Sequence, residues 1–161
     1  MKTLYFIRHA KSSWKYDLSD HQRPLKKRGL TDANHIGKYL KARAITVDQI
    51  ASSDATRART TALTIAGYMN YTESDIEFRR DLYDFSGDQV DQFIRTLDDQ
   101  KNSVMLFGHN PAFTLLANEK GTTYLDNLPT AGVVAIQFDT NSWQNCTKGT
   151  TLFTIFPKQL R

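Results

Sequence analysis

Short apolar runs alternate with stretches of helical periodicity along the chain. Residues 2–8 and 103–107 are nearly continuous runs of β-prone apolar side chains, the pattern of central strands that are covered on both faces. Further extended segments are predicted at 48–52, 76–82, 133–138 and 151–156. The last two alternate apolar and polar side chains, which predicts strands at the edges of a sheet.

Helical spacing fills the intervals between these runs. Thr31 or Asp32 is expected to cap a helix that carries Ile36 and Leu40 on one face. Other helices are predicted at 55–69, at 89–97 and from Pro111 onward. Alternating strands and helices predict an α/β three-layer sandwich, with a mostly parallel central sheet, helices on both faces and an antiparallel edge.

Length and composition favour a single domain over residues 1–161. The chain is 40% hydrophobic and 24% charged, which supplies a core without disulfides or a structural metal. The one cysteine, Cys146, fits a reducing compartment. The first apolar run stops at Arg8, too short for a signal-peptide core, and no run approaches the roughly 20 residues of a membrane span. We therefore expect a cytoplasmic protein without membrane association.

The net charge of +4 suits an anionic substrate. It also suits weak, non-specific contact with nucleic acid, and no specific nucleic-acid partner is expected. Six basic residues lie in one early segment: Lys11, Lys15, Arg23, Lys26, Lys27 and Arg28. We interpret most of these lysines as solvated loop charges, and the alternative is an electropositive rim that attracts phosphates.

Arginine and histidine side chains follow three predicted strands. Arg8 and His9 end the first, Arg57 follows the second, and His109 follows the strand that ends at residue 107. Ligands bind beyond the carboxyl ends of the strands in such sheets, so these four residues would share one crevice if the strands are neighbours. Arginine forks bind phosphate oxygens, and neutral imidazole is a nucleophile near pH 7. The set predicts phosphoryl transfer through a covalent phosphohistidine, and a helix N-terminus at Pro111 would add free N–H groups.

Four motifs resemble signatures of the histidine phosphatase superfamily. Residues 4–12 (LYFIRHAKS) resemble its Arg-His-Gly motif, with alanine in place of glycine, and residues 52–62 (SSDATRARTTA) resemble its second motif. Residues 107–111 (FGHNP) resemble its second-histidine motif. Residues 20–29 (DHQRPLKKRG) are similar to a segment of the SixA-like branch, the phosphohistidine phosphatases. The resemblance runs from the N-terminus to about residue 111.

The resemblance implies a phosphoglycerate mutase-like fold and a role for each catalytic residue. Arg8 and Arg57 would hold phosphate oxygens, His9 would attack phosphorus in line, and His109 would donate to the phosphate. No cofactor or metal is implied. The partner would be a phosphorylated protein, above all one that carries phosphohistidine, or a small phosphorylated substrate, and a short SixA-like chain is expected to be a monomer.

Three further residues have weaker assignments. Arg23 and Asn110 are candidates for substrate contact, although a structural salt bridge would explain Arg23 nearly as well. Asp84 is the best candidate for the general acid, because larger family members place a carboxylic acid after a middle strand. No clean match to that acid appears in residues 80–85. Its absence favours a labile donor such as phosphohistidine over sugar phosphates, whose alkoxide leaving groups need protonation.

Several alternatives remain open. A mutase or a small-molecule phosphomonoesterase of the same superfamily would use the same residues, although a mutase needs a lid for which the chain has little room. A non-catalytic phosphate-binding module would need the arginines but could lose His9. A cysteine phosphatase is excluded, because Leu152 stands where the arginine six residues after Cys146 is required.

Overall fold

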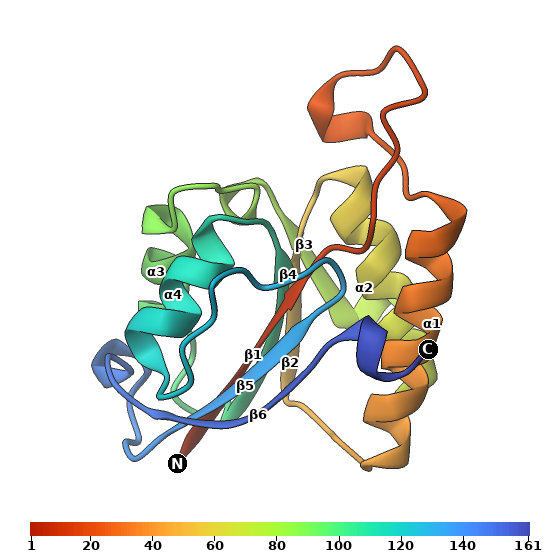
Figure 1. The fold of residues 1–161 in the computed structure, drawn as a ribbon. Coiled ribbons are helices and arrows are strands. Elements are labelled where there is room, and N and C mark those ends of the chain that lie inside the picture. Colours follow the sequence, from red (N-terminus) through yellow and green to blue (C-terminus); the bar gives the residue numbers. More distant parts are fainter.

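Six strands form one sheet in the computed structural model, which describes residues 1–161 (Figure 1). They are β1 (Lys2–Arg8), β2 (Gln49–Ser53), β3 (Ile76–Arg79), β4 (Ser103–Gly108), β5 (Val133–Phe138) and β6 (Thr150–Ile155). Their order across the sheet is β3-β2-β4-β1-β5-β6, and β5 alone runs opposite to the other five strands. The predicted α/β class with a mostly parallel sheet is confirmed.

One edge prediction was wrong. Residues 133–138 form β5, which lies between β1 and β6 and is buried at every position except Gln137. Its single polar residue produced an apparent alternation, but both faces of the strand are covered. Residues 151–156 do form an edge, as β6, and the extended segment predicted at 76–82 divides into β3 and a short 3₁₀ turn, η3 (Arg80–Leu82).

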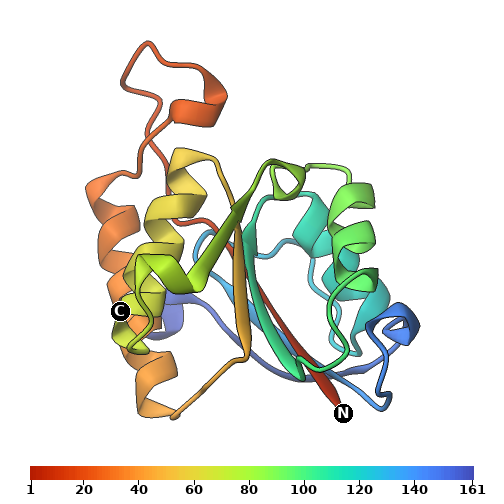
Figure 2. The ribbon, with the colours of Figure 1, turned by 180° about the vertical axis from the view of Figure 1, so that it is seen from behind.

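Helices cover both faces of the sheet (Figures 1 and 2). The helices α1 (Lys27–Ala42) and α2 (Thr56–Tyr68) share one apolar core with Tyr5 and Ile7 of β1. The helices α3 (Asp88–Arg95) and α4 (Ala112–Lys120) share the other core with Leu4 and Phe6. Successive side chains of one strand therefore enter opposite cores, as the pleat of a central strand requires. None of the helices is both long and apolar enough to cross a membrane.

The helix α1 begins earlier than predicted. Lys26 is its N-cap, whereas Thr31 and Asp32 lie inside the helix, and Asp32 is buried there. The reason is tertiary: the Lys26 N–H donates to the Lys11 carbonyl over 2.9 Å. A Cβ atom at Gly29 would lie only 2.2 Å from the same carbonyl oxygen, so glycine permits this close approach.

A loop between β1 and α1 projects beyond the carboxyl edge of the sheet (Figures 1 and 2). An antiparallel bridge between Ser12 and Leu25 closes its base. Within it, a 3₁₀ turn, η1 (Asp20–Gln22), contacts α2. The loop thus brings residues from the basic early segment over the strand ends where Arg8 and His109 lie.

Candidate active site

Neighbouring strands bring the two histidines together. The strands β1 and β4 pair in parallel with Arg8 opposite Gly108, so His9 and His109 follow at the same edge. Their ring centroids are 5.2 Å apart. The strand β2 pairs with β4 on its other side, and α2 then carries Arg57 back toward His9. The four residues that the motifs singled out therefore meet at one place.

The hydrogen bonds of His9 determine which of its nitrogens is free. Nδ1 lies 2.7 Å from the Ala10 carbonyl oxygen, which can only accept, so Nδ1 carries the ring proton. Nε2 keeps its lone pair and accepts from Nε of Arg57 over 3.3 Å. Burial, and then the charges of Arg57 and Arg8, lower the pKa of His9 to about 3 against the favourable Ala10 contact. His9 is therefore a neutral imidazole near pH 7.

A cavity of about 260 Å³ opens in front of His9, and most charged groups on its wall are cations. Eleven residues line it: Arg8, His9, Lys11, Ser12, Trp14, Asp20, Arg23, Arg57, Phe85, Asn110 and Thr130. Four of them are lysines or arginines and only one is a carboxylate. A wall of this charge favours an anion.

Two buried polar atoms beside the cavity have no partner within the protein. They are Nε of Arg8 and Nδ1 of His109. Nη1 of Arg8 donates to the Leu128 carbonyl over 3.0 Å, and Nε2 of His109 lies 2.8 Å from Oγ of Ser53. Buried polar groups are rarely left unpaired in folded proteins, so an anion that supplies acceptors would relieve the Arg8 group. Burial, and then His9 and Arg57, lower the pKa of His109 to about 2, which keeps it neutral as well.

Asp20 and Tyr83 belong to the site although the sequence analysis gave neither a role. Asp20 accepts from Arg57 over 2.9 Å, from Arg23 over 3.2 Å and from the Tyr83 hydroxyl over 2.5 Å. Partial burial acts to raise the pKa of Asp20, but the hydrogen bonds from Tyr83 and Arg57 outweigh it and hold the pKa well below its usual range. The sequence feature that could have pointed to Asp20 is its position three residues before Arg23.

Arg23 reaches the cavity from the projecting loop. It is buried, donates to Oγ of Ser12 over 2.8 Å, and stacks 3.5 Å above the ring of Trp14. The structure thus gives Arg23 both a place on the cavity wall and an ion pair with Asp20. By contrast, Arg59 lies on the surface of α2, where it pairs with Glu73.

Asp84 is not placed as a general acid. Its carboxylate accepts from the backbone N–H groups of Gly87, Gln89 and Val90 over 3.0–3.1 Å, and from the backbone and hydroxyl of Ser86. It thereby caps α3, and it does not line the cavity. A protonated carboxyl there would lose acceptor capacity that these buried N–H groups need, so the assignment of Asp84 is corrected.

The start of α4 also differs from the expectation of free N–H groups. The Phe113 N–H donates to the His109 carbonyl over 3.0 Å, and the Thr114 N–H donates to Oδ1 of Asn110 over 3.1 Å. Nδ2 of Asn110 donates to the Leu128 carbonyl over 2.9 Å. Asn110 lines the cavity, but its polar atoms hold the surrounding loops in place.

No group of three or more histidine, cysteine, aspartate or glutamate side chains is arranged to hold a metal ion. A neutral imidazole set among arginines, at the carboxyl edge of an α/β sheet, defines a site for an anionic group.

The family model for the histidine phosphatase superfamily (branch 1) matches residues 4–102. The chain belongs to this superfamily, which confirms the family predicted from the motifs.

Known proteins agree with this placement. An uncharacterized protein of Mycobacterium tuberculosis is 30% identical over 141 residues, which are 81% of this chain and 86% of that protein. The protein histidine phosphatase SixA, solved with tungstate, has a TM-score of 0.82 at 20% identity and covers 99% of both chains. A SixA structure from Agrobacterium tumefaciens has a TM-score of 0.78 at 23% identity, over 96% of this chain and 97% of that one. The fold is SixA-like, and the superfamily supports phosphatase activity.

Proposed function

We propose that this protein is a phosphatase that takes the phosphoryl group onto Nε2 of His9, and that its substrate is a phosphohistidine on a phosphotransfer protein. In the proposed roles, Arg8, Arg23 and Arg57 bind the phosphoryl oxygens, and His109 lies next to these oxygens. The single observation that supports the proposal best is the state of His9: neutral, with its proton on Nδ1, and with its Nε2 lone pair directed among arginines.

The reaction divides into two displacements. Nε2 of His9 forms a bond to phosphorus while the bond between phosphorus and the substrate nitrogen breaks. A water molecule then attacks phosphorus and the bond to Nε2 breaks. His9 returns to its neutral form with the proton on Nδ1, and inorganic phosphate leaves with the oxygen and both hydrogens of the water. Arginines that are already in place stabilise the charge on the three equatorial oxygens in both steps without further reorganisation.

The lack of an available acid favours phosphohistidine over a phosphomonoester. Asp20 is the only carboxylate on the cavity wall, and its hydrogen bonds keep it ionised, while Asp84 caps a helix. An alkoxide leaving group would need a proton, a contribution of roughly 10²–10⁴ in rate. A phosphorylated imidazole that carries a proton on its other nitrogen leaves as neutral imidazole, so the first step needs no acid from the protein.

Exposed apolar side chains around the cavity favour a protein substrate. Trp14 of the projecting loop and Phe85 before α3 line the cavity and are 75% and 41% exposed. Tyr16 and Leu18 lie further along the projecting loop and are 55% and 46% exposed. Large exposed apolar side chains that cluster beside a site are typical of protein contact surfaces. A small metabolite inside a 260 Å³ cavity would leave the outer part of this surface uncovered.

The test compares donors side by side. A histidine phosphotransfer domain phosphorylated on its histidine, phosphoramidate, and p-nitrophenyl phosphate are each mixed with the protein, and the reaction is quenched within milliseconds. We expect transient acid-labile phosphate on His9 with the first two donors and far lower kcat/KM with p-nitrophenyl phosphate. Higher kcat/KM on phosphomonoesters would instead support a phosphomonoesterase, and tight phosphate binding without turnover would support a binding module.

A further inference from the structure

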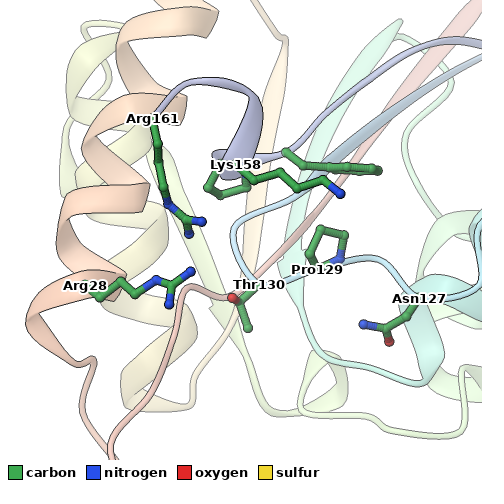
Figure 3. Close-up of a pocket in the computed structure, with 8 residues that line it drawn as sticks. Arg28, Asn127, Pro129, Thr130, Lys158 and Arg161 are labelled. Atoms are coloured by element: carbon green, nitrogen blue, oxygen red, sulfur yellow. The ribbon is translucent and has the colours of Figure 1, made fainter.

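A second cavity lies at the carboxyl end of β6, beside the short 3₁₀ turn η5 (Pro157–Gln159). Its volume is about 330 Å³, and Figure 3 shows the residues that line it: Arg28, Asn127, Pro129, Thr130, Phe156, Pro157, Lys158 and Arg161. The guanidinium groups of Arg28 and Arg161 extend toward Thr130, whereas Lys158 runs along the Pro129 side (Figure 3). None of the proposed catalytic residues lines this cavity.

The positive charges of this second cavity exceed their partners. Asp32, which is buried in α1, is the one carboxylate that pairs with them. Arg161 donates to it twice, over 3.2 and 2.8 Å, whereas Arg28 approaches it only to 3.9 Å and is 65% exposed. Lys158 is exposed and makes no ion pair. Lys158 thus has no carboxylate partner and Arg28 has only this long contact with Asp32, so these two cations can meet an anion from outside.

A shared wall joins this cavity to the candidate active site. Thr130 lines both cavities. The loop before it is fixed from the active-site side, because Arg8 and Asn110 both donate to the Leu128 carbonyl, over 3.0 and 2.9 Å. Asn110 also donates to the Asn127 side chain over 3.0 Å. Only this loop therefore separates the second cavity from a substrate whose phosphoryl group is bound at His9.

We propose that the second cavity receives carboxylate side chains of the protein whose phosphoryl group is bound at His9. This inference rests on the proposed function and extends it, because it assigns an acidic surface beside the phosphorylated histidine to the substrate. Arg28 and Lys158 would pair with these carboxylates, and Arg161, held by Asp32, would fix the back of the cavity. Contacts of this kind raise association rate and specificity through charge complementarity.

The test removes Lys158 and the weakly paired Arg28. The variants are Arg28→Gln, Lys158→Gln and the double variant, with Lys148→Gln as a matched control, because Lys148 is exposed in the turn that precedes β6, at the end of that strand opposite to the cavity. The substrates are a phosphorylated histidine phosphotransfer domain with acidic residues beside its histidine, and phosphoramidate, which has no second anionic group. We expect the double variant to lose about fivefold to tenfold in kcat/KM on the domain at low salt. Its kcat/KM on phosphoramidate, and both values for the control, should stay unchanged.

A binding measurement separates this inference from the proposed function. Calorimetry of the unphosphorylated domain with each variant needs no turnover, and its Kd should rise by a similar factor in the double variant only. If the wild type binds the domain through Arg28 and Lys158 but turns over neither donor, the proposed function fails and the inference stands. Unchanged kcat/KM and Kd on the domain, or an equal loss on phosphoramidate, would overturn the inference.

Discussion

Nε of Arg57 donates to Nε2 of His9 over 3.3 Å, although the two residues are 48 positions apart in the chain. The contact is possible only because the His9 ring is neutral and its proton lies on Nδ1. The two Nη atoms of Arg57 are held at the same time by Asp20. The guanidinium is therefore fixed beside the atom that would attack phosphorus.

Replacement of His9 tests the proposed nucleophile. We expect His9→Ala to lower phosphate release by at least about a thousandfold, since loss of a nucleophile removes the covalent route. Phosphate should still bind, because the arginines remain. Phosphate release assays and calorimetry measure the two effects, and His35→Ala on α1 is the control. Appreciable turnover by a clean His9→Ala preparation would refute the assignment.

Two arginines on α2 allow a matched comparison. Arg57→Gln should lower kcat/KM by about a hundredfold or more, because charge stabilisation at the transferring group is lost. Arg59→Gln removes the same charge two positions later, from a residue that pairs with Glu73 on the surface, and should leave kcat/KM within about twofold. Equal losses in the two variants would show that overall helix charge, rather than the position of Arg57, matters.

The two buried histidines predict how stability depends on pH. Their folded pKa values lie near 3 and 2, below the value of about 6.5 in an unfolded chain. Between these limits the unfolded state binds protons that the folded state does not, so the free energy of unfolding falls as pH drops below about 6.5. At pH 5 each histidine should cost about 2 kcal/mol relative to pH 7.5.

Urea unfolding at pH 7.5 and pH 5 measures this loss. His9→Asn and His109→Asn should each reduce the difference between the two pH values, whatever they do to stability at pH 7.5. Asp20, whose folded pKa is also lowered, becomes protonated in the unfolded chain only near pH 4 and so contributes little above pH 5. A wild-type protein that is equally stable at both pH values would contradict the prediction.

Asp84 should matter for stability and not for catalysis. Asp84→Ala leaves the N–H groups of Gly87, Gln89 and Val90 without their acceptor, and we expect it to lower the free energy of unfolding by about 2 kcal/mol. The kcat on a phosphorylated domain should stay within about twofold, since no proton transfer is lost. Asp88→Ala in the first turn of the same helix is the control. A large fall in kcat with unchanged stability would restore Asp84 as the acid.

The projecting loop predicts a difference between large and small donors. Tyr16→Ser combined with Leu18→Ser removes exposed apolar area that lies outside the cavity. We expect kcat/KM on a phosphorylated domain to fall about tenfold, mainly through KM, since burial of such side chains contributes on the order of 1–2 kcal/mol. Steady-state kinetics with phosphoramidate should be unchanged. Equal effects on both donors would show that the loop acts on the cavity itself.

The sequence alone determined the class of fold and pointed to four residues that the structure places together. Central strands buried on both faces are apolar without a break, so β1 and β4 were evident, and ligand-binding residues follow strand ends in parallel sheets. Arg8, His9, Arg57 and His109 could be singled out because chemistry restricts which residue types can serve phosphoryl transfer, and the structure brings the four together. The local sequence pattern is sufficient to predict a feature where a residue type at a given position has few alternative explanations.

Tertiary structure decided what depends on partners distant in the chain. The start of α1 depends on the close contact between the Lys11 backbone and Gly29. The interior position of β5 depends on its pairing with β6 on its outer side. Asp20 joins the site only because the projecting loop folds over α2, and Asp84 leaves it because α3 starts where the Asp84 carboxylate can cap it. An aspartate has the same side chain whether it pairs with arginines in the site or caps a helix. Its role is set by the donors that the folded chain brings to it, and no local pattern contains that information.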